Sequence, residues 1–185
     1  LVLSRFFDKE KQLSSDTVVG TVMTNLALEQ KLKEEKIKLH RSRVGDKYVL
    51  EDMLRLHCNL GGEQSGHTIL LDDCPTGDGI LTSLRMVEVM TSEGAALSDL
   101  VADYREFPQI ILNVPVSRKD ELKKYPEIMH VLQEARKELG QSGRVNFRYS
   151  GTEPLARVMV EGREQKQIEF LARRIAAAVE TFLNP

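Results

Sequence analysis

The sequence predicts an α/β domain of the sandwich type, followed by a small α+β domain with an antiparallel sheet and two helices. From residue 16 to about 92, short β-rich runs alternate with helical patterns, which is typical of a parallel α/β unit. Beyond Pro108 the order changes to strand, helix, two strands and helix. Gly94 and Pro108 flank a short helical stretch between the two patterns, so we predict domains over 1–104 and 109–185.

The first domain begins with a predicted buried strand over 18–23. Asn25 is placed to cap the following helix, in which Leu28 and Leu32 share a face. A second strand is expected over 37–44. Apolar residues then recur at helical spacing from Val49, and this helix leads into an expected Gly-rich turn at 61–62 and a third strand over 67–71.

A further helix is expected from Ile80 to about Met90, with Asp78 as its N-cap. Its residues are apolar nearly all round. We therefore expect this helix to be buried on every side.

The second domain is expected to contain a strand over 109–116, a helix over 128–139, strands over 144–149 and 156–161, and a last helix. The last helix carries one continuous apolar stripe: Ile168, Leu171, Ala172, Ile175, Ala178, Val179 and Phe182. Such a stripe predicts packing against a sheet.

Composition excludes several classes of protein. The 185 residues are 41% hydrophobic with a net charge of −2, so there is no basic field for nucleic acid. No apolar run approaches the roughly 20 residues of a membrane span, and no membrane partner is expected. Cys58 and Cys74 have no metal-site spacing, so neither zinc nor a disulfide is predicted and a reducing cytoplasm fits. Leu1 is expected to be an internal position of a longer chain, because no Met precedes it.

Opposed arginines are the first functional signal. Residues 144–149 and 156–161 both alternate polar and apolar side chains, and 150–155 is the expected connection. Pairing Arg148 with Arg157 also sets Phe147 against Val158 and Arg144 against Glu161, both favourable pairs. This register places two guanidinium groups opposite each other, with only Glu153, in the connection, as a nearby acid.

A bound dianion would resolve that repulsion. Hydroxyls and backbone N–H groups of Ser150, Gly151 and Thr152 suit phosphate oxygens, with Gly151 expected to supply a positive φ. The alternative is a solvated hairpin with free arginines.

A second candidate site is the loop Gly62-Glu63-Gln64-Ser65-Gly66-His67. Glu63 can accept from two sugar hydroxyls or an amino group, Ser65 can donate or accept, and an imidazole such as that of His67 can donate or accept a proton. The alternative is structural, with a capping acid, a turn serine and a satisfied histidine. Aspartates at 72, 73 and 78 lack calcium-loop spacing, so no metal ligand is predicted.

The motifs together resemble the α-D-phosphohexomutase superfamily. They are GEQSGH (62–67), TGDG (76–79) and RYSGTEPLARVMVEG (148–162), and TVVGTVMTNLALE (17–29) and VGDKYVLEDM (44–53) agree with the branch that acts on glucosamine phosphates. Asp46 stands where other branches often have His, which supports the amino-sugar branch. The resemblance covers the whole chain.

The resemblance implies a four-domain isomerase whose third and fourth domains are present here. It implies that Glu63 and Ser65 bind sugar hydroxyls, with His67 as a possible catalytic acid or base. The implied phosphate-binding residues are Arg148, Ser150, Gly151, Thr152 and Arg157. The implied ligands are glucosamine phosphates and a hexose bisphosphate, and the implied role is supply of UDP-N-acetylglucosamine for cell walls. A homodimer is compatible with this resemblance.

Family members also need a phosphoserine loop and an Asp-rich loop for Mg2+, and neither motif occurs in these residues. The expectation is that missing N-terminal domains supply both, and that this chain alone binds sugar phosphate without turning it over. The rivals are a phosphoglucomutase or phosphomannomutase relative and a free-standing phosphosugar-binding module.

Overall fold

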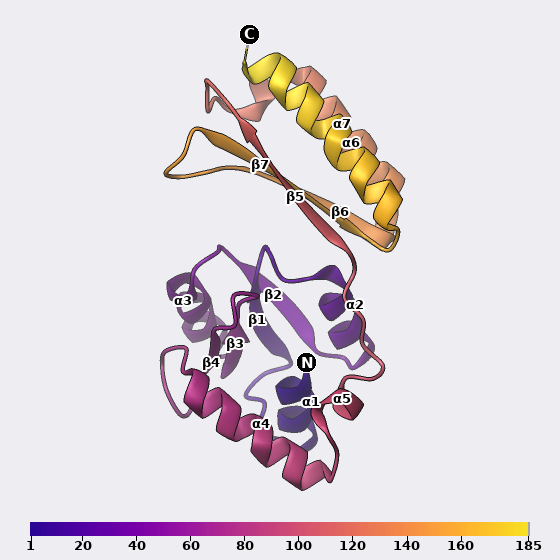
Figure 1. Ribbon diagram of the computed structural model, residues 1–185. Coiled ribbons are helices and arrows are strands. Elements are labelled where there is room, and N and C mark those ends of the chain that lie inside the picture. The colour runs from indigo at the N-terminus through magenta and orange to yellow at the C-terminus, as the bar shows by residue number, and fades with distance from the viewer. Residues whose placement is uncertain (185) are drawn as a thin grey trace. The chain divides into compact units, whose positions relative to one another are not determined.

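The computed structural model describes residues 1–184 and divides the chain into two compact units, one from Leu1 to Glu106 and one from Phe107 onward (Figure 1). The helices of the first unit are α1 (Val2–Lys9), α2 (Leu26–Glu34), α3 (Asp46–Leu56), α4 (Gly79–Glu93) and α5 (Leu97–Leu100). Its strands are β1 (Thr17–Thr21), β2 (Lys38–Ser42), β3 (Leu60–Gly62) and β4 (Thr68–Leu70). They form one sheet in the order β2-β1-β3-β4.

Helices cover both faces of this sheet, because alternate residues of β1 point to opposite sides. Val18 packs in a cluster with residues of α1, α2 and α4. Val19, its neighbour, packs with Val49 and Met53 of α3. The first unit is therefore an α/β sandwich, as the sequence predicted, although α1 was not foreseen.

The sheet is mixed rather than wholly parallel. β1 is parallel to β2 and β3, whereas β4 is antiparallel to β3. The expected Gly-rich turn at 61–62 is wrong, since both residues belong to β3. A Cβ on Gly61 would overlap Met53, so this glycine allows α3 to approach the strand closely.

The burial expected for α4 is also wrong. Val89 is its only buried residue, while Ile80, Leu84 and Val87 are 77%, 64% and 57% exposed. The predicted caps are confirmed: Asp78 accepts from the N–H groups of Ile80 and Leu81, and Asn25 caps α2 through the N–H of Ala27.

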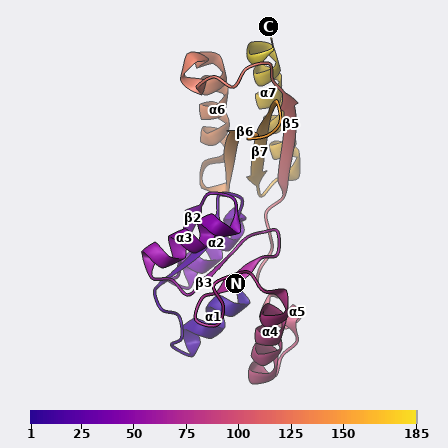
Figure 2. The same cartoon turned by 90° about the vertical axis from the view of Figure 1, so that its left-hand side faces the viewer.

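The second unit is a three-stranded antiparallel sheet with two long helices on one face (Figure 2). Its strands are β5 (Gln109–Pro115), β6 (Gly143–Tyr149) and β7 (Leu155–Gly162), and its helices are α6 (Pro126–Leu139) and α7 (Gln165–Leu183), with short 3-10 turns η1 (Leu122–Lys124) and η2 (Gly140–Ser142). The sheet order is β5-β7-β6. This is the predicted α+β arrangement.

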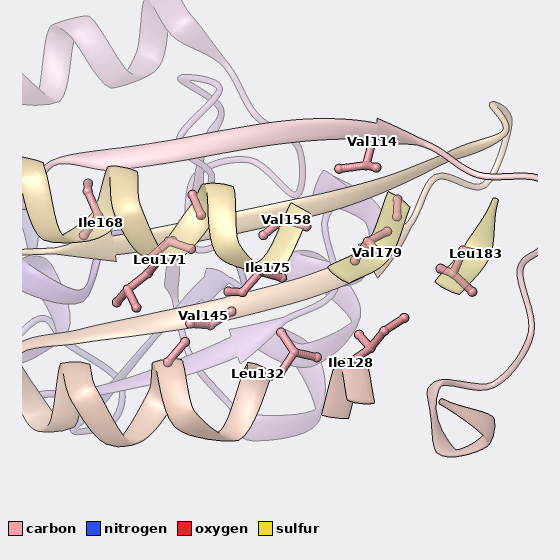
Figure 3. Packing of buried hydrophobic residues seen from close by; sticks show 14 of the residues in the cluster. Val114, Ile128, Leu132, Val145, Val158, Ile168, Leu171, Ile175, Val179 and Leu183 are labelled. Atoms are coloured by element: carbon pink, nitrogen blue, oxygen red, sulfur yellow. The ribbon is translucent and has the colours of Figure 1, made fainter. Parts of the chain in front are cut away.

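The core of the second unit lies between the helices and the sheet (Figure 3). Ile168, Leu171 and Ile175 of the predicted apolar stripe are fully buried against Val158 and its neighbours. Because helices fill this face, the alternate residues of β6 and β7, including both arginines, occupy the other face.

We predict that two Leu→Ala substitutions in the first unit differ strongly. Leu32→Ala, in the core under α2, should lower the free energy of unfolding by about 2–5 kcal/mol, because it leaves a cavity. Leu84→Ala, on the exposed face of α4, should change it by less than about 1 kcal/mol. Chemical denaturation of both variants checks this, and equal losses would show that α4 is covered in solution.

Candidate functional site: two loops

Three loops meet at one edge of the first sheet. β1, β2 and β3 run parallel, so their carboxyl ends at Thr21, Ser42 and Gly62 lie at the same edge. Loops at this edge are where ligands gather in α/β domains. The 63–67 loop follows β3 there.

The 63–67 loop closes a hairpin between β3 and β4, rather than joining a helix to a strand as expected. The N–H of Glu63 donates to the carbonyl of His67 at 2.8 Å, and the N–H of Gly66 donates to the carbonyl of Glu63 at 3.1 Å. Gly66 has φ of 98°, a conformation that glycine adopts without strain. Hydrogen bonds within the turn therefore define its backbone conformation.

Two of the predicted site residues meet in this loop. Ser65 Oγ lies 3.0 Å from His67 Nδ1, and either atom can be the donor. Within residues 1–184, the Glu63 carboxylate and His67 Nε2 have no other hydrogen-bond partner. The loop thus presents an acceptor pair and a ring nitrogen that are open to a ligand.

The TGDG segment approaches the side chain of the histidine. A Cβ on Gly77 would lie 3.2 Å from His67 Cδ2 and 3.3 Å from its Cβ, so Gly77 lies next to this side chain. The two motifs GEQSGH and TGDG are therefore one structural site, which their separation in sequence does not reveal.

The described residues do not fit a magnesium site. Asp78 caps α4, Asp72 accepts from Asn59 Nδ2 at 2.6 Å, and Asp73 pairs with Arg85 at 2.8 Å. No three His, Cys, Asp or Glu side chains are grouped to hold a metal in the part of the chain that the structure describes.

The second site lies at the β6–β7 connection, and its predicted register is confirmed. Arg148 is opposite Arg157, and Phe147 is opposite Val158. Arg144 is opposite Glu161 and bonds to it at 2.5 Å. The two arginines therefore share the face that the helices leave uncovered.

Part of the charge conflict is resolved inside the protein. Arg157 Nη2 lies 3.1 Å from Glu153 Oε2, so this guanidinium is already paired. Arg148 has no ion-pair partner among the described residues. Arg148 is thus free of an ion pair, and Arg157 is paired with an exposed acid.

The 150–154 turn is held at both ends. The N–H of Ser150 donates to the carbonyl of Leu155 at 2.8 Å, and the Ser150 hydroxyl accepts from the N–H of Glu153 at 3.2 Å. The N–H groups of Gly151 and Thr152 donate to no atom of residues 1–184. The expected positive φ at Gly151 is wrong, because its φ is not positive. Gly151 therefore does not use the left-handed conformation that glycine can adopt without strain.

Two residues beside this turn were not predicted from the sequence. Asn113 of β5 is opposite Arg157, so an amide extends the row of arginines across the sheet. Within residues 110–115 of β5, Asn113 is the one polar side chain, and this contrast with its apolar neighbours was an available signal. Lys119 Nζ donates to the carbonyl of Ser150 at 2.6 Å. No local pattern shows that the segment after β5 returns to this turn.

The neighbours of Lys119 form a small polar cluster. Asp120 accepts from the Tyr125 hydroxyl at 2.9 Å, which lowers the pKa of Asp120, and Lys124 acts in the same direction. Burial raises the pKa of Tyr149, helped by Tyr125 and Asp120. The acid next to Lys119 in sequence is therefore engaged with other groups.

Family models cover both units. The model "Phosphoglucomutase/phosphomannomutase, alpha/beta/alpha domain III" matches residues 1–107, and that of the "C-terminal domain" of the same family matches 111–178. The chain belongs to the phosphoglucomutase/phosphomannomutase family. Its two units are domains III and IV of that family.

Individual relatives are similar over nearly all of the chain. A phosphoglucosamine mutase of Koribacter versatilis is 47% identical over 181 residues, which are 97% of this chain and 39% of that protein. The chain thus spans about two fifths of the length of the curated phosphohexomutases it matches.

Solved phosphohexomutases have the same fold. Aspergillus fumigatus N-acetylphosphoglucosamine mutase in complex with GlcNAc-6P and magnesium aligns with a TM-score of 0.70 at 20% identity, over 91% of this chain and 42% of that one. A variant of that enzyme in complex with glucose 1,6-bisphosphate aligns with a TM-score of 0.73 at 19% identity, over 99% of this chain and 41% of that one. No helix in residues 1–184 is long and apolar enough to cross a membrane.

We predict that Gly77→Ala moves the His67 ring. The added methyl needs space that the ring now occupies, so the imidazole and Ser65 resonances should shift in NMR spectra. Gly79→Ala is the matched control, because a Cβ there would meet nothing within 4 Å. Identical His67 spectra in both variants would show that the two motifs are not in contact.

Proposed function

We propose that this chain is the substrate-binding half of a phosphoglucosamine mutase, which interconverts glucosamine 6-phosphate and glucosamine 1-phosphate. The observation that carries the proposal is the 150–154 turn, where two unpaired N–H groups lie beside an arginine without a counter-ion. The high identity to phosphoglucosamine mutases supports the amino-sugar substrate.

Unit 2 holds the phosphate that is not being transferred. Arg148 and Arg157 supply planar donors, and Ser150, Gly151 and Thr152 supply N–H and hydroxyl groups. A dianion can outcompete Glu153 for Arg157, because that acid is half exposed and carries a single charge. Each hydrogen bond to the charged phosphate contributes about 1.5–3 kcal/mol.

Unit 1 binds the sugar. Glu63 accepts hydrogen bonds from sugar hydroxyls, and Ser65 can accept or donate one. Both side chains therefore suit a ligand that presents either end in turn. His67 acts as the acid or base at the reacting oxygen, with Nδ1 oriented by Ser65 and Nε2 open. A carboxylate at position 63 also suits the ammonium group of glucosamine.

The phosphoserine and Mg2+ of the complete enzyme come, in this proposal, from further domains, since the relatives are much longer. Magnesium would neutralise charge on the transferred phosphoryl group. The 185 residues alone bind glucosamine phosphates without turnover, and mutase activity from them would contradict this part. The complete enzyme would act in the cytoplasm and supply UDP-N-acetylglucosamine for peptidoglycan precursors.

We predict that Arg148→Ala weakens binding of glucosamine 6-phosphate to this chain by about tenfold or more, because a charge-assisted hydrogen bond to the phosphate is lost. Isothermal titration calorimetry measures the change. Arg136→Ala, which removes an exposed arginine of α6, is the matched control for net charge and should leave affinity within about twofold.

Glucose 6-phosphate and glucosamine test the two halves of the ligand separately. Glucosamine, which lacks the phosphate, should show no detectable binding. Glucose 6-phosphate, which lacks the amino group, should still bind, but more weakly than glucosamine 6-phosphate. Unchanged affinity in Arg148→Ala would reject the assignment of the phosphate site, even if the sugar loop were correct.

A further inference from the structure

Lys119 reaches the 150–154 turn from the segment that follows β5. Its Nζ donates to the carbonyl of Ser150 at 2.6 Å, and no other group in residues 1–184 donates to that oxygen. Lys119 forms no ion pair with a described acid. Its ammonium group is therefore committed to one backbone carbonyl.

The same segment fixes the other end of the turn. The N–H of Val116 donates to the carbonyl of Pro154 at 2.9 Å. The segment is itself anchored, because the N–H of Ser117 donates to the carbonyl of Leu183 at 3.2 Å and to Asn184 Oδ1 at 2.7 Å. Lys119 thus extends from a fixed base rather than from a free loop.

The carbonyl of Ser150 and the N–H of Gly151 belong to one peptide plane. In a trans peptide these two groups point in opposite directions, and no cis peptide is found in residues 1–184. Holding the carbonyl toward Lys119 therefore directs the Gly151 N–H to the opposite side. Gly151 has no side chain to resist rotation of this plane, and a Cβ there would meet nothing within 4 Å.

A cationic donor also polarises the peptide. A hydrogen bond accepted by a carbonyl strengthens the donor capacity of the N–H in the same amide. Contact with an ammonium group has this effect to a greater degree than contact with a neutral donor. The Gly151 N–H should consequently bind an anion more strongly.

We propose that Lys119 is a positioning residue of the phosphate site: by binding the Ser150 carbonyl, it locks the 150–151 peptide with its N–H directed at the anion. This rests on the proposed function of the 150–154 turn. Lys119 acts through the peptide and need not contact the phosphate itself. The rival role is a long-range charge that attracts phosphate without ordering the turn.

The test uses the full 185-residue chain and glucosamine 6-phosphate as the probe. Lys119→Met removes charge and donor, Lys119→Arg keeps both, and Lys123→Met is the control that removes a nearby exposed lysine charge from η1. Affinity is measured by calorimetry at low and high sodium chloride. The 15N shift of the Gly151 amide is measured without ligand, since it responds to hydrogen bonding at the Ser150 carbonyl.

Lys119→Met should weaken binding by about fivefold to twentyfold, and Lys119→Arg should restore it to within about threefold. The difference between Lys119→Met and Lys123→Met should persist at high salt, where long-range charge effects are screened. The Gly151 15N resonance should move upfield in Lys119→Met alone.

Three outcomes overturn the inference. They are an unchanged Gly151 resonance in Lys119→Met, unchanged affinity in that variant, and a deficit that disappears at high salt to the level of Lys123→Met. If the unmodified chain binds no sugar phosphate, the proposed function fails as well. The Gly151 shift in ligand-free protein still reports the Lys119 contact in that case, so the two failures are distinguishable.

Discussion

Directly opposed residues of an antiparallel pair share a face of the sheet, and the β6–β7 register makes Arg148 and Arg157 such a pair. Like charges on directly opposed residues repel each other when no anion lies between them. The helices α6 and α7 fill the other face, so both arginines stay on the uncovered face of the sheet. Glu153 relieves the conflict on one side only. Other polar groups gather beside this pair: the N–H groups of Gly151 and Thr152, the amide of Asn113 opposite Arg157, and the Lys119 ammonium group bound to the Ser150 carbonyl.

The register could be predicted from sequence because strands have a period of two and because three cross-strand pairs agreed at once. Phe147 with Val158 and Arg144 with Glu161 both favoured the alignment that the structure has. Capping by Asn25 and Asp78 was predictable for a similar reason, since it depends on residues two or three positions away. Local chemistry of this kind is fully contained in the sequence.

The predictions that were wrong, and the contacts that were not predicted, depend on groups that are distant in sequence. Apolar residues around α4 showed how hydrophobic the helix is but not how much of it other elements cover, and three of its large side chains are exposed. Gly61 was assigned to a turn, whereas it admits Met53 of α3. Lys119 was overlooked because its contact spans 31 residues. The pairing of Ser65 with His67 lay within reach of local reasoning, but the packing of Gly77 on that ring did not.

A crystal structure of this chain soaked with glucosamine 6-phosphate would show directly whether the 150–154 turn binds phosphate. We expect phosphate density at the 150–154 turn, with its oxygens bonded to the Arg148 guanidinium and to the N–H groups of Gly151 and Thr152. Arg157 should move from Glu153 toward the phosphate. Phosphate bound elsewhere, with Arg148 still unpaired and the Arg157–Glu153 pair intact, would contradict it.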